Sequence, residues 1–352
     1  MRPSKIKIMM ITPSLQLGGS QRFMTYLSKY LNSNRFEISL VVISNNNNSF
    51  NIENINIINL NLSRVRFSIF KILNLSKKIK PNIIFTTQFH LNLYIILFKN
   101  LFSSNVKFIG RETNILSEKL SNKKKSNIFY AFLIKRYYNF FDKIVCQSTD
   151  MFDDLYYYFN IPKTRLSIIN NPIDRYFIVD DRKASQQIDF NYDVIAIGST
   201  LGEQKGFERL IDAFFCIKDT KIRLAIIGEG KNRKKLEKKI EYLGMQDRIS
   251  LVGLKKNINE CYKNAKVFAL SSYYEGFPNV LLECGLHGIP VVAFNIKGGI
   301  NDIIIDGLNG IIVPNGDLKQ FSDALVKCIY SPFNSEDIKR NILEKYSAEM
   351  II

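Results

Sequence analysis

Short runs of apolar residues alternate with amphipathic stretches along almost the whole chain, and this alternation limits the possible folds more than any other feature. Strands separated by helices in this way are typical of parallel βαβ units. In the first half we predict helices at 21–31, 67–80 and 126–140 and strands at 5–12, 38–43, 83–86, 107–109 and 143–147. In the second half we predict a helix from 206, helices at 231–243, 258–264, 278–287 and 317–329, and strands at 193–197, 223–228, 249–252, 266–270, 290–294 and 310–313. The fold class is therefore α/β, with two doubly wound domains.

The alternation stops at one polar and unpatterned segment, 180–191 (DDRKASQQIDFN), which suits an interdomain linker. We predict a Rossmann-like first domain at 1–178, a Rossmann-like second domain at 179–330, and a tail at 331–352 that crosses back to the first domain as a helix. Ligands of doubly wound folds bind at the carboxyl ends of the strands. The two domains are therefore expected to face each other across a cleft that holds the substrates.

The charge of the chain is divided unevenly. Residues 1–178 hold 25 Lys and Arg against 9 Asp and Glu, a net +16, whereas residues 179–352 hold 24 against 23, a net +1. The total of +17 favours a polyanionic partner: nucleic acid, an anionic membrane surface or a phosphate-bearing substrate. A hydrophobic fraction of 46% is high enough to exclude a disordered chain.

Other features of the sequence bear on the compartment. Five scattered cysteines without a CxxC pair predict reduced thiols, and they argue against a disulfide framework or a zinc site. The apolar run from Ile8 to Ile11 is too short for a signal peptide and predicts a strand. No apolar stretch reaches the roughly 20 residues that a membrane-spanning helix needs. We therefore expect a cytoplasmic protein, either soluble or held at a membrane surface.

Two basic, aromatic-rich stretches lie in the first half, at 64–80 (RVRFSIFKILNLSKKIK) and 119–143 (KLSNKKKSNIFYAFLIKRYYNFFDK). Interfacial helices have this composition, and each Lys or Arg near an anionic leaflet contributes about 1 kcal/mol. Either stretch alone is better explained as an ordinary helix packed on a sheet. Together with the charge imbalance, they favour a first domain that docks peripherally on the inner face of the cell membrane.

Two loops combine glycine with the start of a predicted helix. Gly18 and Gly19 follow the first strand, where helix N–H groups could receive an anion, although a tight turn explains them equally well. The stretch from Gly198 to Gly206 follows the first strand of the second domain and adds the cation Lys205. It suits either a phosphate site or a turn with a solvated lysine. Neither loop has the full GxGxxG spacing of a dinucleotide site.

Two carboxylates, Glu275 and Glu283, lie in the segment YYEGFPNVLLE, where Pro278 suits the first helical position. We place Glu275 at the end of a strand and Glu283 two helical turns further on, so that both face one cleft. A carboxylate on an apolar helix is costly unless it accepts hydrogen bonds from a ligand or neighbour. The pair is also compatible with glycoside hydrolysis, and Glu275 alone with a helix-dipole role. A further loop, at 298–299, contains two glycines that could cradle a phosphate.

The order and spacing of these motifs resemble retaining glycosyltransferase family 4. The resemblance runs through GSTLGEQKGF, SSYYEGFPNVLLECGLHGIPVVA and IKGGINDIIIDGLNGIIVP in the second half, and through LGGSQRFMTYL, KIVCQSTDMFDDL and IINNPID in the first. It implies the GT-B fold and transfer of a sugar from a nucleotide donor with retained anomeric configuration. It also implies that neither a metal ion nor another cofactor takes part.

The resemblance implies roles for individual residues. Glu275 would hold hydroxyls of the donor sugar, Glu283 the ribose hydroxyls, and Lys205 would neutralise the diphosphate. The glycines would approach the sugar and the phosphates, with Gly18 and Gly19 closing from the other domain. The donor-binding set would comprise Gly18, Gly19, Gly198, Lys205, Glu275, Gly276, Phe277, Asn279, Val280, Glu283, Gly298 and Gly299.

One departure from the family pattern concerns the diphosphate. Relatives commonly carry a second cation, an Arg, soon after the glycine that corresponds to Gly198. Ser199 and Thr200 stand there in this chain. We expect other donors, such as Arg209 or backbone N–H groups, to take part in diphosphate binding.

The other departures concern the acceptor side and one histidine. GRETN, at 110–114, stands where many relatives have a His, and it looks like the version found in envelope-polysaccharide transferases. Arg111 and Glu112 are therefore candidate catalytic residues facing the cleft, with a structural ion pair as the alternative. His90, Arg111 and Asn114 are candidate acceptor-binding residues, although His90 could also be a packed loop histidine. His287 replaces a small residue and is expected to pack on its helix.

We therefore predict a retaining hexosyltransferase of the family 4 type. It would move a hexose or N-acetylhexosamine from a nucleotide sugar, UDP- rather than GDP-linked, to a lipid-linked oligosaccharide of an O-antigen- or capsule-type polysaccharide. The expected partners are the nucleotide sugar, the lipid-linked acceptor and an anionic membrane surface, and not nucleic acid. The alternatives are a non-catalytic binder of polyanions such as nucleic acid, and another GT-B enzyme such as a nucleotide-sugar epimerase.

Overall fold

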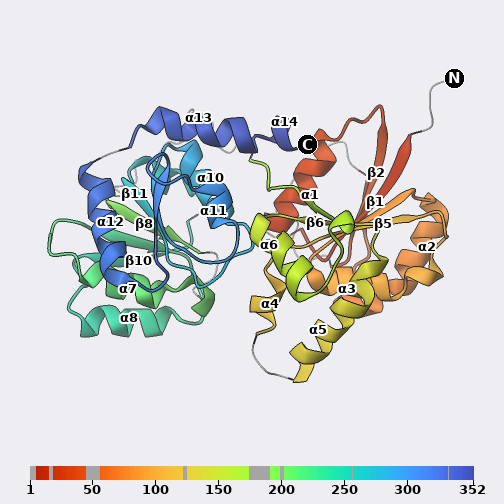
Figure 1. Ribbon diagram of the computed structural model, residues 1–352, viewed down its shortest axis with the longest axis horizontal. Coiled ribbons are helices and arrows are strands. Elements are labelled where there is room, and N and C mark those ends of the chain that lie inside the picture. The colour runs from red at the N-terminus through yellow and green to blue at the C-terminus, as the bar shows by residue number, and fades with distance from the viewer. Residues whose placement is uncertain are drawn as a thin grey trace. The chain divides into compact units, whose positions relative to one another are not determined.

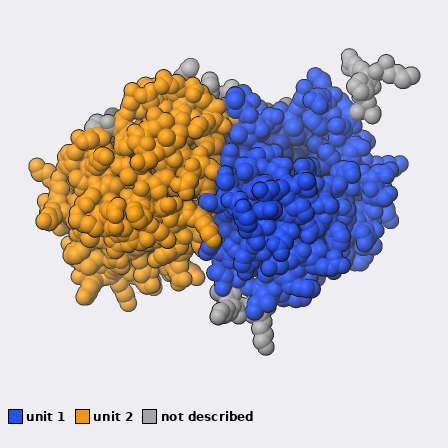
Figure 2. Space-filling model, viewed as in Figure 1, with its two compact units in different colours: residues 1–172, 348–352 blue, residues 173–347 orange. Residues whose placement is uncertain are grey.

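The chain divides into two compact units, which Figure 2 shows in two colours. Unit 1 comprises Met1–Pro172 and Ala348–Ile352, and unit 2 comprises Ile173–Ser347. The predicted boundary after residue 178 lies outside the described part of the chain. The computed structural model describes residues 5–15, 19–44, 56–121, 125–173, 191–198, 202–255, 257–331 and 333–352.

Unit 1 contains a seven-stranded sheet in the order β3-β2-β1-β4-β5-β6-β7, and all its pairings are parallel (Figure 1). The strands are β1 (Ile6–Thr12), β2 (Phe36–Val42), β3 (Asn56–Asn59), β4 (Ile83–Thr87), β5 (Lys107–Arg111), β6 (Lys143–Cys146) and β7 (Leu166–Ile168). The five strands predicted for this half are all present. The two edge strands were not predicted, because runs of four and three residues are too short to show a pattern.

Apolar cores cover both faces of this sheet, as a parallel sheet requires. Met10 faces the core that contains Phe23, and Met9 faces the core that contains Tyr138. The sequence did not predict α3, because FHLNLYIIL is apolar on nearly every side and lacks a helical period. The helices of unit 1 are α1 (Gly19–Tyr30), α2 (Ile69–Ile79), α3 (Phe89–Leu97), α4 (Leu116–Lys119), α5 (Lys125–Tyr137), α6 (Thr149–Asp153) and α14 (Ala348–Ile351).

Unit 2 contains a six-stranded sheet in the order β10-β9-β8-β11-β12-β13, again with parallel pairings (Figure 1). Its strands are β8 (Val194–Ile197), β9 (Leu224–Ile227), β10 (Ile249–Gly253), β11 (Val267–Leu270), β12 (Val291–Phe294) and β13 (Gly310–Val313). Its helices are α7 (Phe207–Phe215), α8 (Arg233–Tyr242), α9 (Asn259–Lys263), α10 (Asn279–Leu286), α11 (Ile300–Ile303), α12 (Leu318–Tyr330) and α13 (Ser335–Tyr346). Both units are therefore doubly wound α/β folds, as predicted.

The C-terminal tail forms two helices. The first, α13, packs against α10 of unit 2, and Gly285 permits the approach, because a Cβ there would lie 2.2 Å from a carbon of Ile342. The second, α14, belongs to unit 1 and contacts α1. None of the described helices is long and apolar enough to cross a membrane. All five cysteines are free thiols.

In each sheet the strand order reverses at one place. The reversal lies between β1 and β4 in unit 1 and between β8 and β11 in unit 2. Loops that leave the carboxyl ends of strands at such a switch point diverge, and doubly wound proteins bind ligands there. The switch point of unit 2 is where the predicted Lys205 and Glu275 loops begin.

Candidate functional site

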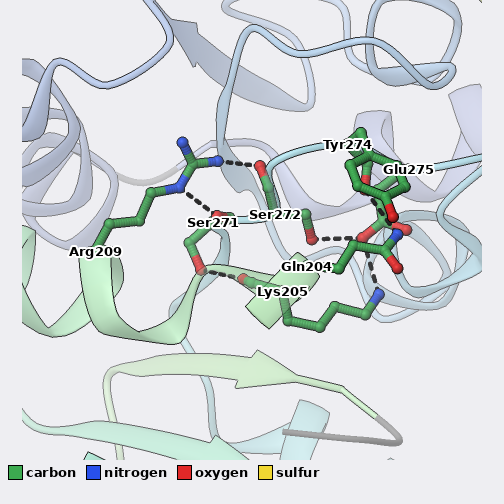
Figure 3. A network of polar contacts seen from close by, with 7 residues as sticks. All are labelled: Gln204, Lys205, Arg209, Ser271, Ser272, Tyr274 and Glu275. Carbon is green, nitrogen blue, oxygen red and sulfur yellow. Dashed lines mark hydrogen bonds and ion pairs between the residues drawn. The ribbon is translucent and has the colours of Figure 1, made fainter. Parts of the chain in front are cut away.

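Lys205 and Glu275 are in direct contact, although 70 positions separate them in the sequence. Lys205 ends a short 3-10 turn after β8, and Glu275 lies in the loop after β11. The Lys205 Nζ donates to Glu275 Oε1 at 2.8 Å, and their side chains are only 22% and 8% exposed. The expectation that Glu275 ends a strand was wrong, because β11 ends at Leu270. The ion pair thus joins the two loops of the switch point (Figure 3).

The backbone and a hydroxyl group fix the Glu275 carboxylate. Ser272 Oγ donates to the same Oε1 that accepts from Lys205. The Glu275 N–H donates to the carbonyl of Lys297 at 3.1 Å. A Cβ on the next residue, Gly298, would lie 2.3 Å from the Glu275 carbonyl oxygen, so only glycine fits there. Gly298 therefore has a structural task that the sequence did not reveal: it lets its loop lie against Glu275.

The loop that carries Lys205 is fastened to the loop after β11. Gln204 Nε2 donates to the Tyr274 carbonyl at 2.9 Å, and Ser271 Oγ donates to the Lys205 carbonyl at 2.9 Å (Figure 3). Gly206 has a φ of +62°, and a Cβ on it would lie 2.0 Å from the Ser271 carbonyl oxygen. Backbone geometry thus determines the position of the Lys205 ammonium group before any ligand binds.

Arg209, which the sequence suggested as a substitute cation for the diphosphate, is bound to the loop after β11. Its guanidinium donates to the carbonyls of Ser271 and Ser272 (Figure 3). It also donates to Asn315 Oδ1, and the residue is 8% exposed. The group also lies 4.1 Å from the centre of the Tyr273 ring. Burial lowers the pKa of Arg209 to about 10, so it remains a cation at neutral pH. Arg209 therefore acts as a structural cation that holds the loop after β11.

Glu283 lies inside α10, and it is 6% exposed. Tyr262 Oη donates to Glu283 Oε2 at 2.9 Å, and the Tyr262 ring stacks on His287 with centroids 5.0 Å apart. His287 Nε2 in turn lies 3.1 Å from Asn259 Oδ1. The packing role expected for His287 is confirmed. The α10 helix starts only at Asn279, so helical spacing does not relate Glu283 to Glu275.

Several of the remaining predicted donor-binding residues are close in sequence to Lys205 or Glu275. Phe277 belongs to the apolar core and meets the Tyr346 ring, and Val280 packs against the same core. Gly276 is buried, and Asn279 is half-buried at the start of α10. Gly198 lies against Phe207 and Lys205, while Gly299, with a φ of +74°, precedes α11. Gly18, Ser199 and Thr200 lie outside the described residues.

A hollow of about 310 Å³ opens on unit 2 next to the Lys205 loop, but none of the predicted site residues lines it. Its walls come from the starts of α7 and α8 and from Tyr273, and they include the exposed ion pair of Lys235 and Glu208. We place the candidate site at the Lys205–Glu275 pair instead, because fixed charges converge there. Among the described residues, no group of three or more His, Cys, Asp or Glu side chains could hold a metal ion.

In unit 1, Arg111 and Glu112 are fully buried at the end of β5, and they do not pair with each other. Arg111 donates to Asn171 Oδ1, and its guanidinium lies 3.7 Å from the centre of the Phe23 ring. Glu112 Oε1 accepts from Asn92 and Tyr138, at 2.7 Å each. These partners belong to opposite faces of the sheet, since Phe23 and Tyr138 lie in different cores. The structural ion pair between Arg111 and Glu112 is therefore not formed.

Burial raises the pKa of Glu112 to about 7, although the hydrogen bonds from Tyr138 and Asn92 lower it. The acceptor candidates His90 and Asn114 are more accessible than Arg111. His90 is exposed in the first turn of α3, with its ring centre 5.9 Å from that of Tyr130, and partial burial of the ring lowers its pKa. Asn114 is half-buried after β5, and Gly19 is exposed at the start of α1.

Sequence reasoning missed the residues that hold these groups in place. Ser272, Gln204 and Tyr262 each bind a predicted site residue or its loop, but nothing in their own spacing marks them. Tyr262 and Gln204 act over long sequence distances, and only the fold brings them to their partners.

Comparison with known proteins agrees with this fold. The chain matches the family model described as Glycosyltransferase Family 4 over residues 17–176 and the one described as Glycosyl transferases group 1 over residues 179–350. It is 25% identical over 331 residues to the amylovoran biosynthesis glycosyltransferase AmsD of Erwinia amylovora, covering 93% of this chain and 90% of AmsD.

A second curated relative comes from Campylobacter jejuni. It is N-acetylgalactosamine-N,N'-diacetylbacillosaminyl-diphospho-undecaprenol 4-alpha-N-acetylgalactosaminyltransferase, 29% identical over 310 residues, covering 85% of this chain and 84% of the relative. Among solved structures, Anabaena HepE in complex with UDP matches with a TM-score of 0.79 at 18% identity, covering 98% of this chain and 97% of HepE. The lipopolysaccharide outer core galactosyltransferase WaaB matches with a TM-score of 0.77 at 19% identity, with the same coverage. The chain belongs to the family 4-like glycosyltransferases, and its fold is GT-B.

Proposed function

We propose that this glycosyltransferase moves a hexose or N-acetylhexosamine from a UDP-sugar to a lipid-linked oligosaccharide during polysaccharide biosynthesis, with retained anomeric configuration. The observation that carries the proposal is the buried Lys205–Glu275 pair at the switch point of unit 2. The names of the two relatives support the pathway and the acceptor class, since one makes amylovoran and the other acts on a diphospho-undecaprenol-linked sugar. The UDP bound to HepE supports the choice of donor base.

The geometry suits departure of a nucleoside diphosphate. Negative charge develops on the diphosphate as the bond to the sugar breaks, and a preorganised cation stabilises that charge. Lys205 is such a cation, because its loop is fixed by Gln204 and Ser271. Glu275 uses Oε1 for Lys205 and Ser272, so Oε2 can accept from a sugar hydroxyl. We propose that Lys205 supplies the countercharge without a metal ion, and activity that persists in excess EDTA tests this.

Glu283→Ala is expected to weaken UDP binding about tenfold or more. A hydrogen bond from a ribose hydroxyl to a carboxylate contributes roughly 1.5–3 kcal/mol, and alanine removes the acceptor. Isothermal titration of UDP into the full chain measures the change. The matched control is Asp323→Ala, which removes an exposed carboxylate of α12 that pairs only with Lys319 in the described structure. Unchanged UDP affinity in Glu283→Ala would show that the ribose assignment is wrong.

The α5 patch supports docking of unit 1 on an anionic membrane. We define it as Ile128, Phe129, Phe132 and Phe140, four apolar side chains that are 62, 58, 61 and 41% exposed. Basic residues border it: Arg136 lies 5.8 Å from the Phe140 ring centre, and Lys135 lies beside Arg136 in the last turn of α5. Exposed aromatic groups beside Lys and Arg are what an interfacial helix presents to lipid. Phe70 of α2, 79% exposed, adds to the apolar surface of the unit.

The double variant Phe129→Ser with Phe132→Ser is expected to bind anionic vesicles at least tenfold more weakly than the wild type. Burial of one Phe side chain contributes roughly 1.5–3 kcal/mol, so two lost contacts suffice. Co-sedimentation with phosphatidylglycerol vesicles, at low and at high salt, measures binding. Phe215→Ser is the control, because Phe215 is 52% exposed but lies in unit 2. Equal vesicle binding by the double variant and the wild type would contradict the docking surface.

A further inference from the structure

Unpartnered polar atoms gather at one place in unit 1. Among the described residues, five buried side-chain atoms lack a hydrogen-bond partner, and four of them belong to Thr87, Arg111 and Glu112. These atoms are Thr87 Oγ1, Arg111 Nε and Nη1, and Glu112 Oε2. Native proteins leave few buried polar groups unsatisfied, so a concentration of them calls for a functional explanation. All three residues lie at the carboxyl edge of β4 and β5, where doubly wound folds bind ligands.

Thr87 and Arg111 point to the same face of the sheet. They are directly paired across β4 and β5, and neighbours in register on parallel strands share a face. Two residues earlier, Phe85 and Ile109 pack in the core that contains Phe23. The guanidinium of Arg111 lies over the Phe23 ring, which confirms that face. The Thr87 hydroxyl and the free N–H groups of Arg111 are therefore close neighbours on the α1 side.

No carboxylate of the described chain forms a contact ion pair with Arg111; Glu112 acts on its charge, but its carboxylate accepts from Asn92 and Tyr138. The one hydrogen-bond partner of the Arg111 guanidinium among the described residues is the neutral Oδ1 of Asn171, which accepts from Nη2. Burial lowers the pKa of Arg111 to about 9, so the group is still protonated at neutral pH. A fully buried cation without an anionic partner is costly for the fold. An anion that entered this place would remove that cost.

We propose that Arg111 and Thr87 form a phosphate-binding subsite in unit 1, which takes a phosphate of a diphosphate-bearing substrate. The inference rests on the proposed function, which involves two diphosphates: that of the lipid-linked acceptor and that of the nucleotide. Nε and Nη2 lie along one edge of the guanidinium, and Asn171 Oδ1 now occupies Nη2. A phosphate that replaced this amide oxygen would accept from both nitrogens and from the Thr87 hydroxyl, the side-on geometry that Arg offers to phosphate.

Binding of two probes to the full chain tests the subsite and identifies the source of the phosphate. Farnesyl diphosphate stands in for the acceptor and UDP for the donor, each measured by isothermal titration. Arg111→Met keeps the volume and removes the charge, and such replacements of buried charges are often neutral for stability. Thr87→Val keeps the shape and removes the hydroxyl. We expect Arg111→Met to weaken one probe about 10- to 100-fold and Thr87→Val to weaken the same probe severalfold.

A third variant separates ligand binding from a structural role. Asn171→Asp would give Arg111 an internal anion, so we expect it to raise the melting temperature and at the same time to abolish binding of that probe. If only farnesyl diphosphate binding is lost, the subsite takes the phosphate of the acceptor. If only UDP binding is lost, it takes the phosphate of the donor. Unchanged affinities in Arg111→Met, or equal loss of both probes with a lowered melting temperature, would overturn the subsite. Because these readouts are binding and not turnover, they can fail while the glycosyltransferase function stands.

Discussion

Lys205→Ala is expected to lower the turnover of the donor sugar by about 10²- to 10³-fold. This is the loss that follows removal of one preorganised donor from a developing negative charge. The Lys205 ammonium lies 2.8 Å from Glu275, on a loop whose backbone is hydrogen-bonded on both sides. Release of UDP in the presence of acceptor, at saturating donor sugar, measures the effect.

The control for this variant is Lys266→Ala. Lys266 is also an ion-paired lysine of unit 2, 2.8 Å from Asp193, but it is 57% exposed and directly precedes β11, at the amino edge of the sheet. An exposed ion pair contributes little, so its removal is expected to leave turnover near the wild-type rate. A Lys205→Ala enzyme that turned over at the rate of this control would remove Lys205 from the mechanism.

Gly206→Ala is expected to abolish turnover and to lower the melting temperature more than any other single alanine substitution in the loop. A side chain at a left-handed position costs roughly 1–2 kcal/mol. At Gly206 the added carbon would also lie 2.0 Å from the Ser271 carbonyl, so the loop would have to move and take Lys205 with it. Thermal unfolding together with the UDP-release assay measures both effects.

Gly244→Ala is a matched control for this substitution. Gly244 has a φ of +64°, almost the same as the +62° of Gly206, but a Cβ on it would meet nothing within 4 Å. It should therefore show only the backbone cost, a decrease of a few degrees in melting temperature with turnover preserved. If the two variants lost the same stability, the close approach to Ser271 would not matter.

The sequence predicted every strand of unit 2 because each one is an apolar run bounded by turn residues. It missed α3 because a helix that is apolar on nearly every side has no period, and it missed β3 because four residues show no alternation. The strand order also lay beyond the sequence. In the sheet of unit 2, β8 lies next to β11, although β9 and β10 separate them in the sequence. This adjacency brings Lys205 to Glu275.

Motif spacing located Lys205, Glu275 and Glu283, but not what surrounds them. Arg209 looked available in the sequence, yet it is occupied by two carbonyls and an amide that are 62 to 106 positions away. For Arg111 and Glu112 the sequence left a structural ion pair open as the alternative to side chains that face the cleft. The side chains of adjacent strand residues point to opposite faces of a sheet. Arg111 and Glu112 are therefore on different faces and bind different partners.

The Lys205–Glu275 contact has a consequence for how substrate and product exchange. In the ligand-free protein the cation already has an anion, so an incoming diphosphate must compete with a carboxylate of the same site. The Glu275 carboxylate can pair with Lys205 again once the sugar has been transferred. If Lys205 binds the diphosphate as proposed, the resting site contains its own competitor of UDP, and we expect this to weaken product inhibition and to favour a fast return to the empty enzyme.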